Sequence, residues 1–402
     1  MPRRYGALYA LPAIRWQAGA GLLAQVTQGT AGVGIILVLR GHSGSLVLAG
    51  VVVAALWIAA AVARPIQGRL IDRRGSPEVM AVCGVIHGAA LAGVVGLSSL
   101  HAPGWLLVVF GVLAGLALPP VSTSMRVAWA GAVDLHQRTA AYSLVYLVQE
   151  LAILIGPVIF AGLTAASSAS LALLAVVVIA VSGALVFAAS ARSPGDRRAR
   201  APGPRRGVLR AANMQLLVLV AVLIGSMVGG IQVAAPITAS ARGAPAVAGL
   251  LIAAVSVGGI IGAAIYASGR WRTAPTARLL VLLALVTGSL ALVIPAESLI
   301  VIGGLLMTAG LSLNPALSTL SLVVDQHVCT RSAGEAFGWL STGIAGGTGG
   351  GAAIAATFAQ HQHDPRAGFI VAAVAAATAT LVVLAARRRL SRTPAVSREG
   401  AR

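Results

Sequence analysis

The feature that most constrains this chain is a series of twelve apolar stretches separated by short polar segments. Each is long enough to cross the hydrocarbon core of a bilayer, which takes about 20 residues in a helix. Every backbone polar group inside a bilayer needs an internal partner, so such stretches form helices. The predicted spans are 16–39, 46–68, 79–99, 104–125, 140–164, 169–190, 214–238, 246–268, 278–296, 299–323, 334–358 and 367–386. The expected fold class is an all-α membrane protein with twelve transmembrane helices.

The composition excludes a soluble protein. Hydrophobic residues make up 58% of the 402 residues and charged residues only 10%, whereas soluble domains carry about 25% charged residues. The two cysteines, Cys83 and Cys329, show neither a disulfide framework nor the spacing of metal ligands. The sequence contains no P-loop for ATP. We therefore expect no cofactor, no metal site and no enzymatic activity.

The arginines predict the orientation in the membrane. All 29 basic residues are arginine, and with both termini in the cytoplasm 26 of them fall on the inner side. The three on the outer side are Arg40, Arg242 and Arg366. This distribution follows the positive-inside rule. A net charge of +19 could otherwise indicate nucleic-acid binding, but these arginines follow the membrane side, so no nucleic-acid partner is expected.

A segment rich in Pro, Gly and Arg, 192–213, divides the spans into two sets of six. The predicted domains are a six-helix bundle at 1–191, this cytoplasmic linker, and a second bundle with a basic tail at 214–402. An internal repeat supports the division, because the same residue types recur in the same order. The first copy has Pro119, Ser122, Thr123, Asp134, His136 and Arg138, and the second has Pro315, Ser318, Thr319, Asp325, His327 and Arg331. Two bundles related by an axis along the membrane normal produce such a repeat.

The connection between the second and third spans carries the motif Gly68-Arg69-Leu70-Ile71-Asp72-Arg73-Arg74-Gly75. It resembles the cytoplasmic loop signature of the major facilitator superfamily, G-x-L-x-D-R-x-G. The resemblance implies a transporter in which two six-helix bundles alternate access to a central site. It also implies that this loop docks near the start of helix 11, at 332–335. The predicted conformational latch is Gly68, Asp72, Arg73, Gly75 and Arg126, the last at the cytoplasmic end of helix 4.

Glu150 is the one acid, among ten, that lies deep within a predicted span. At 1.5 Å per residue it lies about 18 Å beyond Arg138, the residue at the cytoplasmic end of helix 5, and so close to the midplane. A charge there costs roughly 2.5–3.5 kcal/mol, which marks such groups as functional candidates. We predict that Glu150 couples transport to protons or binds substrate. The alternative is a hydrogen-bonded structural residue that holds helix 5 to a neighbour.

Four polar side chains in other spans are predicted to contact substrate: Gln25, Gln28, Gln232 and Asn314. Helices 1 and 7, which carry the glutamines, are equivalent under the repeat and face the cavity in the family that the chain resembles. Each side chain could instead form an interhelical hydrogen bond, worth about 0.6 kcal/mol. His87, beside Gly84 and Gly88, is expected to be a neutral packing residue.

Helix 5 also contains Gly156-Pro157 and Gly162. They resemble part of the motif G-x-x-x-G-P-x-x-G-G of drug/proton antiporters in the same superfamily, with Ala152 in place of the first glycine. We therefore predict proton-coupled export of a small amphiphilic molecule by a monomer in the inner or plasma membrane of a bacterium. The expected partners are this substrate, protons and the lipid bilayer. An importer of a small metabolite and a non-transporting membrane sensor remain as alternatives.

Overall fold

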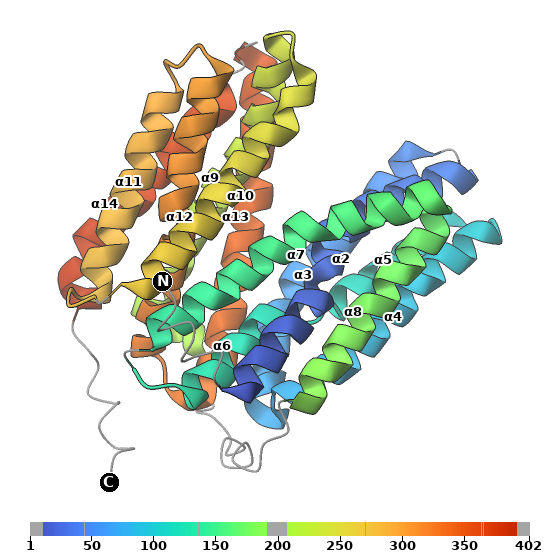
Figure 1. Cartoon of the computed structure of the whole chain (residues 1–402), viewed down its shortest axis with the longest axis horizontal. Helices are drawn as coiled ribbons and strands as arrows, with labels where there is room; N and C mark the ends of the chain where they lie inside the picture. Colours follow the sequence, from blue (N-terminus) through green and yellow to red (C-terminus); the bar gives the residue numbers. More distant parts are fainter. Residues whose placement is uncertain are drawn as a thin grey trace. The chain divides into compact units, whose positions relative to one another are not determined.

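The computed structural model describes residues 11–43, 45–135, 137–190, 207–269, 271–362, 364 and 366–391. Within them the regular structure is helical and no strand occurs (Figure 1). The first half contains α2 (Pro12–Ser43), α3 (Leu46–Arg74), α4 (Ser76–Ser99), α5 (Gly104–Leu116), α6 (Val121–Ala132), α7 (Arg138–Ala166) and α8 (Ala169–Ser190). The second half contains α9 (Ala212–Ala241), α10 (Ala248–Ser268), α11 (Pro275–Val293), α12 (Leu299–His327), α13 (Ala333–Gln362) and α14 (Ala367–Leu390). The twelve predicted spans all fall on these helices, which confirms the all-α class.

Length and hydropathy alone identify eleven membrane-spanning candidates among the described helices, with α5 and α6 counted as one. The twelfth span, α13, does not reach the same hydropathy. Its six glycines between Gly343 and Gly351 contribute helical length but no apolar side chain. The sequence nevertheless predicted it, because it is long and carries no charge between Glu335 and His361.

The chain forms two compact units. The N-terminal unit contains α2 to α6, the part of α7 from Val148, and α8. The C-terminal unit contains α9 to α14 together with residues 133–147, so the first turns of α7 belong to it. The predicted linker lies mostly outside the described residues, and the predicted boundaries of the two bundles stay a prediction.

The fourth span differs from the single helix that the sequence predicted. Residues 117–120 separate α5 from α6, because Pro119 and Pro120 lack the N–H groups that would continue the helix. Side chains of α3 satisfy the carbonyl groups exposed at this break. Gln67 Nε2 donates to Leu116 O at 2.9 Å and to Leu118 O at 3.0 Å, and Arg64 donates to Pro119 O at 3.2 Å. Non-helical backbone at membrane depth is tolerated when protein groups pair with it in this way.

The signature motif also differs from the predicted loop. Gly68 to Arg74 form the last turns of α3, and Gly75 is the single residue before α4. Gly75 adopts φ 89° and ψ 155°, a conformation that is essentially restricted to glycine. Its N–H donates to Ile71 O at 2.8 Å and so caps the helix. The residues between the two glycines are good helix formers, which explains why the helix continues through the motif.

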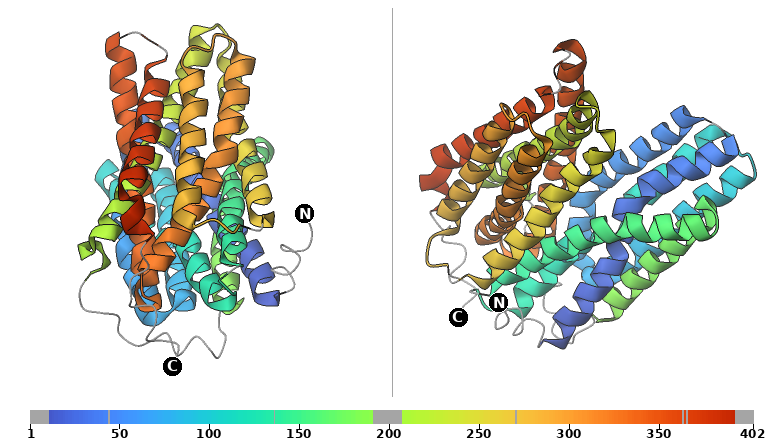
Figure 2. Two further views of the ribbon diagram at one scale, coloured as in Figure 1. Left: turned by 90° about the vertical axis from the view of Figure 1, so that its left-hand side faces the viewer. Right: turned by 45° about the horizontal axis from the view of Figure 1, so that its top comes forward.

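Glycines allow close helix packing inside the C-terminal unit. A Cβ atom added to Gly225 or Gly229 of α9 would overlap the backbone of α13, and one added to Gly347 or Gly351 of α13 would overlap the backbone of α9. The α10–α12 pair is packed in the same manner at Gly258, Gly262 and Gly310. The helices of this unit run alongside one another in both views of Figure 2.

Candidate functional site

Three helices of the N-terminal unit bring a hydroxyl and two amides together. The hydroxyl of Ser122, in the first turn of α6, lies 3.1 Å from Gln25 Oε1 on α2 and 2.9 Å from Gln149 Oε1 on α7. A hydroxyl has one hydrogen, so it donates to one of these oxygens at a time. Gln25 is fully buried and its Nε2 donates to Gly21 O at 3.1 Å. We call Gln25, Ser122 and Gln149 the polar cluster.

Gln149 has hydrogen-bonding capacity to spare. Its side chain is only partly buried, and its Nε2 has no protein partner within the described residues. The polar cluster therefore presents an amide donor that a bound molecule can use. Sequence reasoning identified Gln25 but missed Ser122 and Gln149. Ser122 could have been found from its place just after Pro119-Pro120, since broken helices in transporters often form binding sites.

The predicted residues Gln28 and Gln232 are both accessible. Gln28 is partly buried and lies one turn from Gln25 on α2, whereas Gln232 of α9 is exposed on the C-terminal unit. Neither makes a hydrogen bond within the part of the chain that the structure describes. An amide that faces hydrocarbon loses its hydrogen bonds, so these positions suit surfaces that meet water or a polar solute.

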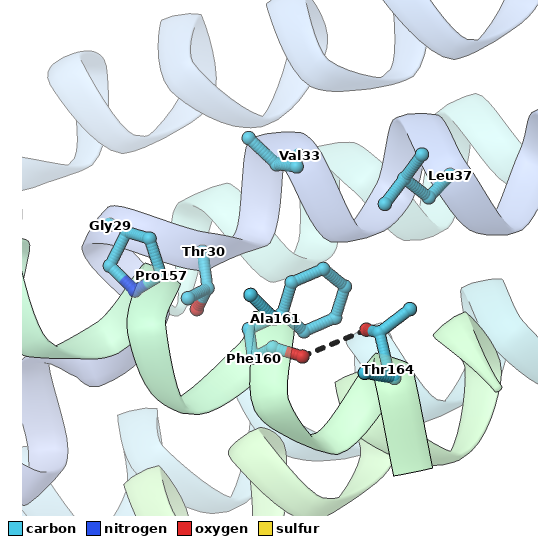
Figure 3. Close-up of a pocket in the computed structure, with 9 residues that line it drawn as sticks. Gly29, Thr30, Val33, Leu37, Pro157, Phe160, Ala161 and Thr164 are labelled. Atoms are coloured by element: carbon cyan, nitrogen blue, oxygen red, sulfur yellow. Dashed lines mark hydrogen bonds between the residues drawn. The ribbon is translucent and has the colours of Figure 1, made fainter. Parts of the chain in front are cut away.

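An apolar pocket of about 400 Å³ lies next to the polar cluster, between α2 and α7 (Figure 3). It begins one residue after Gln28. Its lining is Gly29, Thr30, Val33, Leu37, Pro157, Phe160, Ala161, Thr164 and Ala165. Both lining hydroxyls bond to their own helix, Thr30 to Val26 O and Thr164 to Phe160 O, each at 2.8 Å. The pocket therefore offers an apolar surface to whatever enters it.

Glycine and proline explain why the pocket forms there. The two helices approach closely at Gly29 and Gly156, where an added Cβ would lie 3.0 Å from Ile153 O and 2.8 Å from Val26 O respectively. Pro157 then removes the N–H that would bond to Ile153 O and crowds that carbonyl. The close approach and the proline at the same point leave space beyond the crossing.

The last two candidates from the sequence are Glu150 and Asn314. Glu150, next to Gln149 on α7, is partly buried, and its coupling role stays a prediction. Asn314 of α12 is 2% exposed and packs directly on Gly259 of α10, with no partner for its Nδ2 within the described residues. Its position inside a close helix contact favours a packing role. Within the N-terminal unit, the structure brings Gln25 and Gln28 close to the pocket.

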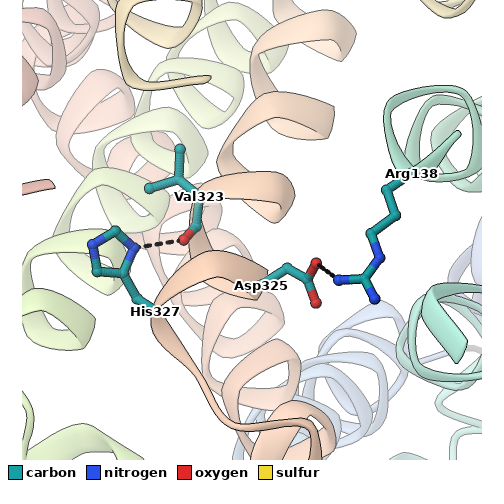
Figure 4. Close-up of polar contacts among 4 residues, drawn as sticks. All are labelled: Arg138, Val323, Asp325 and His327. Carbon is teal, nitrogen blue, oxygen red and sulfur yellow. Dashed lines mark hydrogen bonds and ion pairs between the residues drawn. The ribbon is translucent and has the colours of Figure 1, made fainter. Parts of the chain in front are cut away.

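The beginning of α7 packs within the C-terminal unit. Arg138 forms an ion pair with Asp325 of α12 (Figure 4), Tyr146 Oη lies 3.2 Å from Ser321 Oγ, and the ring of Tyr142 meets that of Phe337 edge-on at 5.8 Å. Close by, His327 Nδ1 lies 2.8 Å from Val323 O. Sequence reasoning listed Arg138 and Asp325 as repeat positions without predicting that they meet. The helix α7 thus carries one member of each group, Gln149 of the polar cluster and Arg138 of this ion pair.

The predicted latch residues lie in the last turns of α3, at Gly75, and on α6, where Arg126 is in the middle of the helix and not at the predicted end of a span. Gly68 is buried in α3, Asp72 is partly buried and Arg73 is exposed, while Arg126 of α6 is 2% exposed. Arg74 and Glu78 form an exposed ion pair across Gly75 at 3.4 Å. The latch function stays a prediction.

His87 behaves as a packing residue. It is 1% exposed, with Nδ1 2.7 Å from Ala114 O and Nε2 3.2 Å from Thr27 Oγ1. Both ring nitrogens are therefore satisfied inside the N-terminal unit. Among the described residues no group of three or more His, Cys, Asp or Glu is arranged to hold a metal ion.

Comparison with known proteins supports this architecture. A sequence profile described as Major Facilitator Superfamily matches residues 18–343. A comparison with curated proteins gives no match. Among solved structures, a bacterial homologue of the iron transporter ferroportin in its outward-facing state is 17% identical, with a TM-score of 0.78 over 93% of this chain and 99% of that chain.

Two further transporters show the same likeness. The human organic anion transporter MFSD10 (TETRAN) is 16% identical, with a TM-score of 0.74 over 91% of this chain and 98% of that one. The E. coli fucose:proton symporter FucP is 13% identical, with a TM-score of 0.71 over 96% of this chain and 100% of that one. Identities this low carry the fold alone, and they confirm the twelve-helix plan.

Proposed function

Because the chain belongs to the Major Facilitator Superfamily and is a multi-pass membrane transporter of that family, we propose that it exports a small amphiphilic molecule in exchange for protons. The two bundles alternate access to a site near the midplane, as transporters built from such repeats do. The proposal rests on the adjacency of the polar cluster and the apolar pocket, which share helices α2 and α7.

The dimensions of this site support an amphiphilic substrate. Gln149 and Pro157 are eight residues apart on α7, about 12 Å along the helix. A molecule of that length would place its polar end at Gln149 and Gln28 and its apolar end against Val33 and Phe160. A fully polar solute would leave the pocket without a partner, and a fully apolar one would leave the amides without hydrogen bonds.

The proposal is tested by transport into inverted membrane vesicles with an imposed pH gradient. A panel of amphiphiles that share one polar head should include molecules that accumulate when the vesicle interior is acidic. Collapsing the gradient should abolish the accumulation. Accumulation that persists without the gradient would contradict proton coupling, and uptake only into right-side-out vesicles would contradict export.

Glu150 is proposed as the coupling acid because it adjoins Gln149 in the middle of α7. Glu150→Gln removes the proton-carrying group but keeps its shape, so we expect pH-driven flux to fall by about tenfold or more. Substrate exchange at equal pH should continue, because exchange needs no net proton movement. The matched control is Glu78→Gln, which changes an exposed acid at the start of α4. Unchanged pH-driven flux in Glu150→Gln would show that coupling lies elsewhere.

The polar cluster also favours a second candidate, an importer of a hydroxyl-rich metabolite. Amides and hydroxyls recognise sugars, and the fucose:proton symporter has the same fold. An importer would take up such a solute into right-side-out vesicles and would show no dependence on the length of an apolar tail. Export of an amphiphile remains the first proposal, because a sugar has no apolar part that would fill the apolar pocket.

A further inference from the structure

A buried arginine lies beside two neighbouring aromatic rings, Tyr266 and Trp271, whose centres are 4.8 Å apart where α10 connects to α11. Arg278 of α11 is 9% exposed, and its guanidinium carbon lies 5.7 Å from the ring centre of Tyr266 and 5.9 Å from that of Trp271. Its Nη1 donates to Tyr266 Oη at 2.9 Å, and Tyr266 Oη in turn lies 2.6 Å from Thr319 Oγ1. Trp271 Nε1 donates to Tyr266 O at 2.7 Å. The guanidinium is thus held in one orientation.

Part of that guanidinium has no protein partner. Neither Nε nor Nη2 of Arg278 makes a hydrogen bond within the described residues. Arg278 also lies in the first turn of α11, where Ala274 provides no side-chain cap and the N–H groups of Thr276 and Ala277 lack helical acceptors. Unbonded guanidinium nitrogens and helix N-terminal N–H groups both favour an anion.

The end of α14 adds more positive charge to this corner. Thr276 Oγ1 donates to Leu390 O at 3.5 Å, so the last turn of α14 lies beside the first turn of α11. That last turn carries Arg387, Arg388 and Arg389, all exposed. The sequence from 266 to 278 and from 384 to 391 contains no acidic residue. The corner therefore carries a local excess of positive charge, which attracts anions.

An apolar surface runs from this corner along the same two helices. Figures 1 and 2 show α11 and α14 side by side, and a contact of 3.1 Å between the hydroxyls of Thr287 and Thr380 links them. The exposed side chains that follow Ala277 on α11 are Val281 and Leu285, 58% and 53% exposed. Those that precede Arg388 on α14 at helical spacing are Leu384 and Leu381, 41% and 62% exposed. These side chains suit acyl chains, as expected on the surface of membrane spans.

We propose that this corner binds the phosphate of an anionic phospholipid in the leaflet that the arginines predict to be cytoplasmic. The phosphate contacts Arg278 Nη2, Arg388 and the first N–H groups of α11, and the acyl chains follow the apolar surface of α11 and α14. Trp271, 45% exposed, lies at the level of the head groups, where tryptophan is enriched. A lipid is the expected source of the phosphate because the cationic end continues directly into the apolar surface.

The test measures lipid retention by the purified full-length protein with native mass spectrometry, titrating phosphatidylglycerol against phosphatidylcholine. The double variant Arg387→Gln/Arg388→Gln changes two exposed side chains, so it should fold. Each arginine near an anionic surface contributes about 1 kcal/mol, so phosphatidylglycerol affinity should fall roughly thirtyfold. Arg278→Gln should weaken it as well. The matched control is Arg40→Gln. Arg40 is exposed in the last turn of α2, on the predicted outer side of the membrane, so this change should have no effect on phosphatidylglycerol affinity.

Three results would overturn the proposal. One is equal phosphatidylglycerol retention in the double variant and in the Arg40→Gln control. Another is equal retention of phosphatidylglycerol and phosphatidylcholine by the unmodified protein, which would indicate annular lipid without a site. The third is displacement of the lipid by inorganic phosphate at millimolar concentration, which would indicate a site for a free anion. None of these readouts depends on transport, so the proposed export function is tested separately.

Discussion

Two helix pairs that correspond under the internal repeat, α2–α7 and α9–α13, differ in how closely they pack. In the N-terminal unit, α2 and α7 approach closely at Gly29 and Gly156, and a pocket of about 400 Å³ lies beyond Pro157. In the C-terminal unit, α9 and α13 stay in close contact over several turns, from Gly225 to Gly229 on one side and from Gly347 to Gly351 on the other. Both pairs use glycine to bring backbones together.

The two pairs differ in how many successive glycine contacts α7 and α13 make. On α7 a proline follows the glycine directly, whereas on α13 three glycine-mediated contacts succeed one another at four-residue spacing, at Gly343, Gly347 and Gly351. Continued glycine contact gives a rigid pair, and a proline after one contact gives a pair with space between its helices. We infer that substrate specificity resides in the α2–α7 pair and that α9–α13 mainly maintains the C-terminal unit.

The largest expected effect concerns the rigid pair. Gly229→Ala places a methyl group onto the carbonyl oxygen of Thr348, and the backbone there cannot yield as a side chain could. We expect the free energy of unfolding to fall by about 1–3 kcal/mol or more. Thermal unfolding in detergent measures it. Gly349→Ala is the control, because nothing lies within 4 Å of its added Cβ; equal stability of the two variants would refute the packing account.

A smaller effect is expected where the open pair diverges. Pro157→Ala restores an N–H that can bond to Ile153 O, which should straighten α7 and narrow the pocket. Substrates with a long apolar tail should show a KM raised by about tenfold, corresponding to ~1.4 kcal/mol of lost apolar burial. Pro236→Ala makes the same change inside α9. If both variants alter tail selectivity equally, the assignment of specificity to α2–α7 is wrong.

The smallest effect concerns hydroxyls that bond to their own helix. Thr30→Val replaces a pocket hydroxyl by a methyl group of similar shape, and the lost bond to Val26 O is only local. We expect KM for tailed substrates to fall by roughly twofold, because the lining becomes more apolar. Thr348→Val removes the corresponding bond to Ile344 O on α13 and should leave KM unchanged. A higher KM in Thr30→Val would indicate that this hydroxyl contacts the substrate.

The sequence predicted the spans well because hydropathy over about 20 residues is a local property. It identified even the glycine-rich α13, but it ended the second span at residue 68, whereas α3 continues to Arg74 and stops at Gly75, where a positive φ requires glycine. It did not predict the break at Pro119-Pro120, although both prolines were visible. Whether a proline pair ends a membrane helix depends on partners such as Arg64 and Gln67, which come from another helix.

The site was only partly predictable for the same reason. Gln25 was found because a polar residue in an apolar span is conspicuous on its own. Nothing in the sequence pairs Gln25 with Ser122 or Gln149. The packing of three helices brings the Ser122 hydroxyl within 3.1 Å of Gln25 Oε1 and within 2.9 Å of Gln149 Oε1. The pairing of Arg138 with Asp325 likewise depends on α7 reaching the C-terminal unit. Such contacts follow from packing, and no sequence spacing specifies them.

Whether the α2–α7 pocket binds the apolar part of the substrate is tested most directly by comparing KM for two substrates. They share a head group, but one carries a short apolar tail and the other a long one. Ala161→Phe fills the pocket from an exposed position, and Val158→Phe places the same ring at a 68% exposed position outside the lining. If the pocket binds the apolar tail, Ala161→Phe removes the preference for the long tail and leaves the KM of the short-tailed substrate unchanged. Val158→Phe changes neither KM. An unchanged ratio of the two KM values in Ala161→Phe would contradict it.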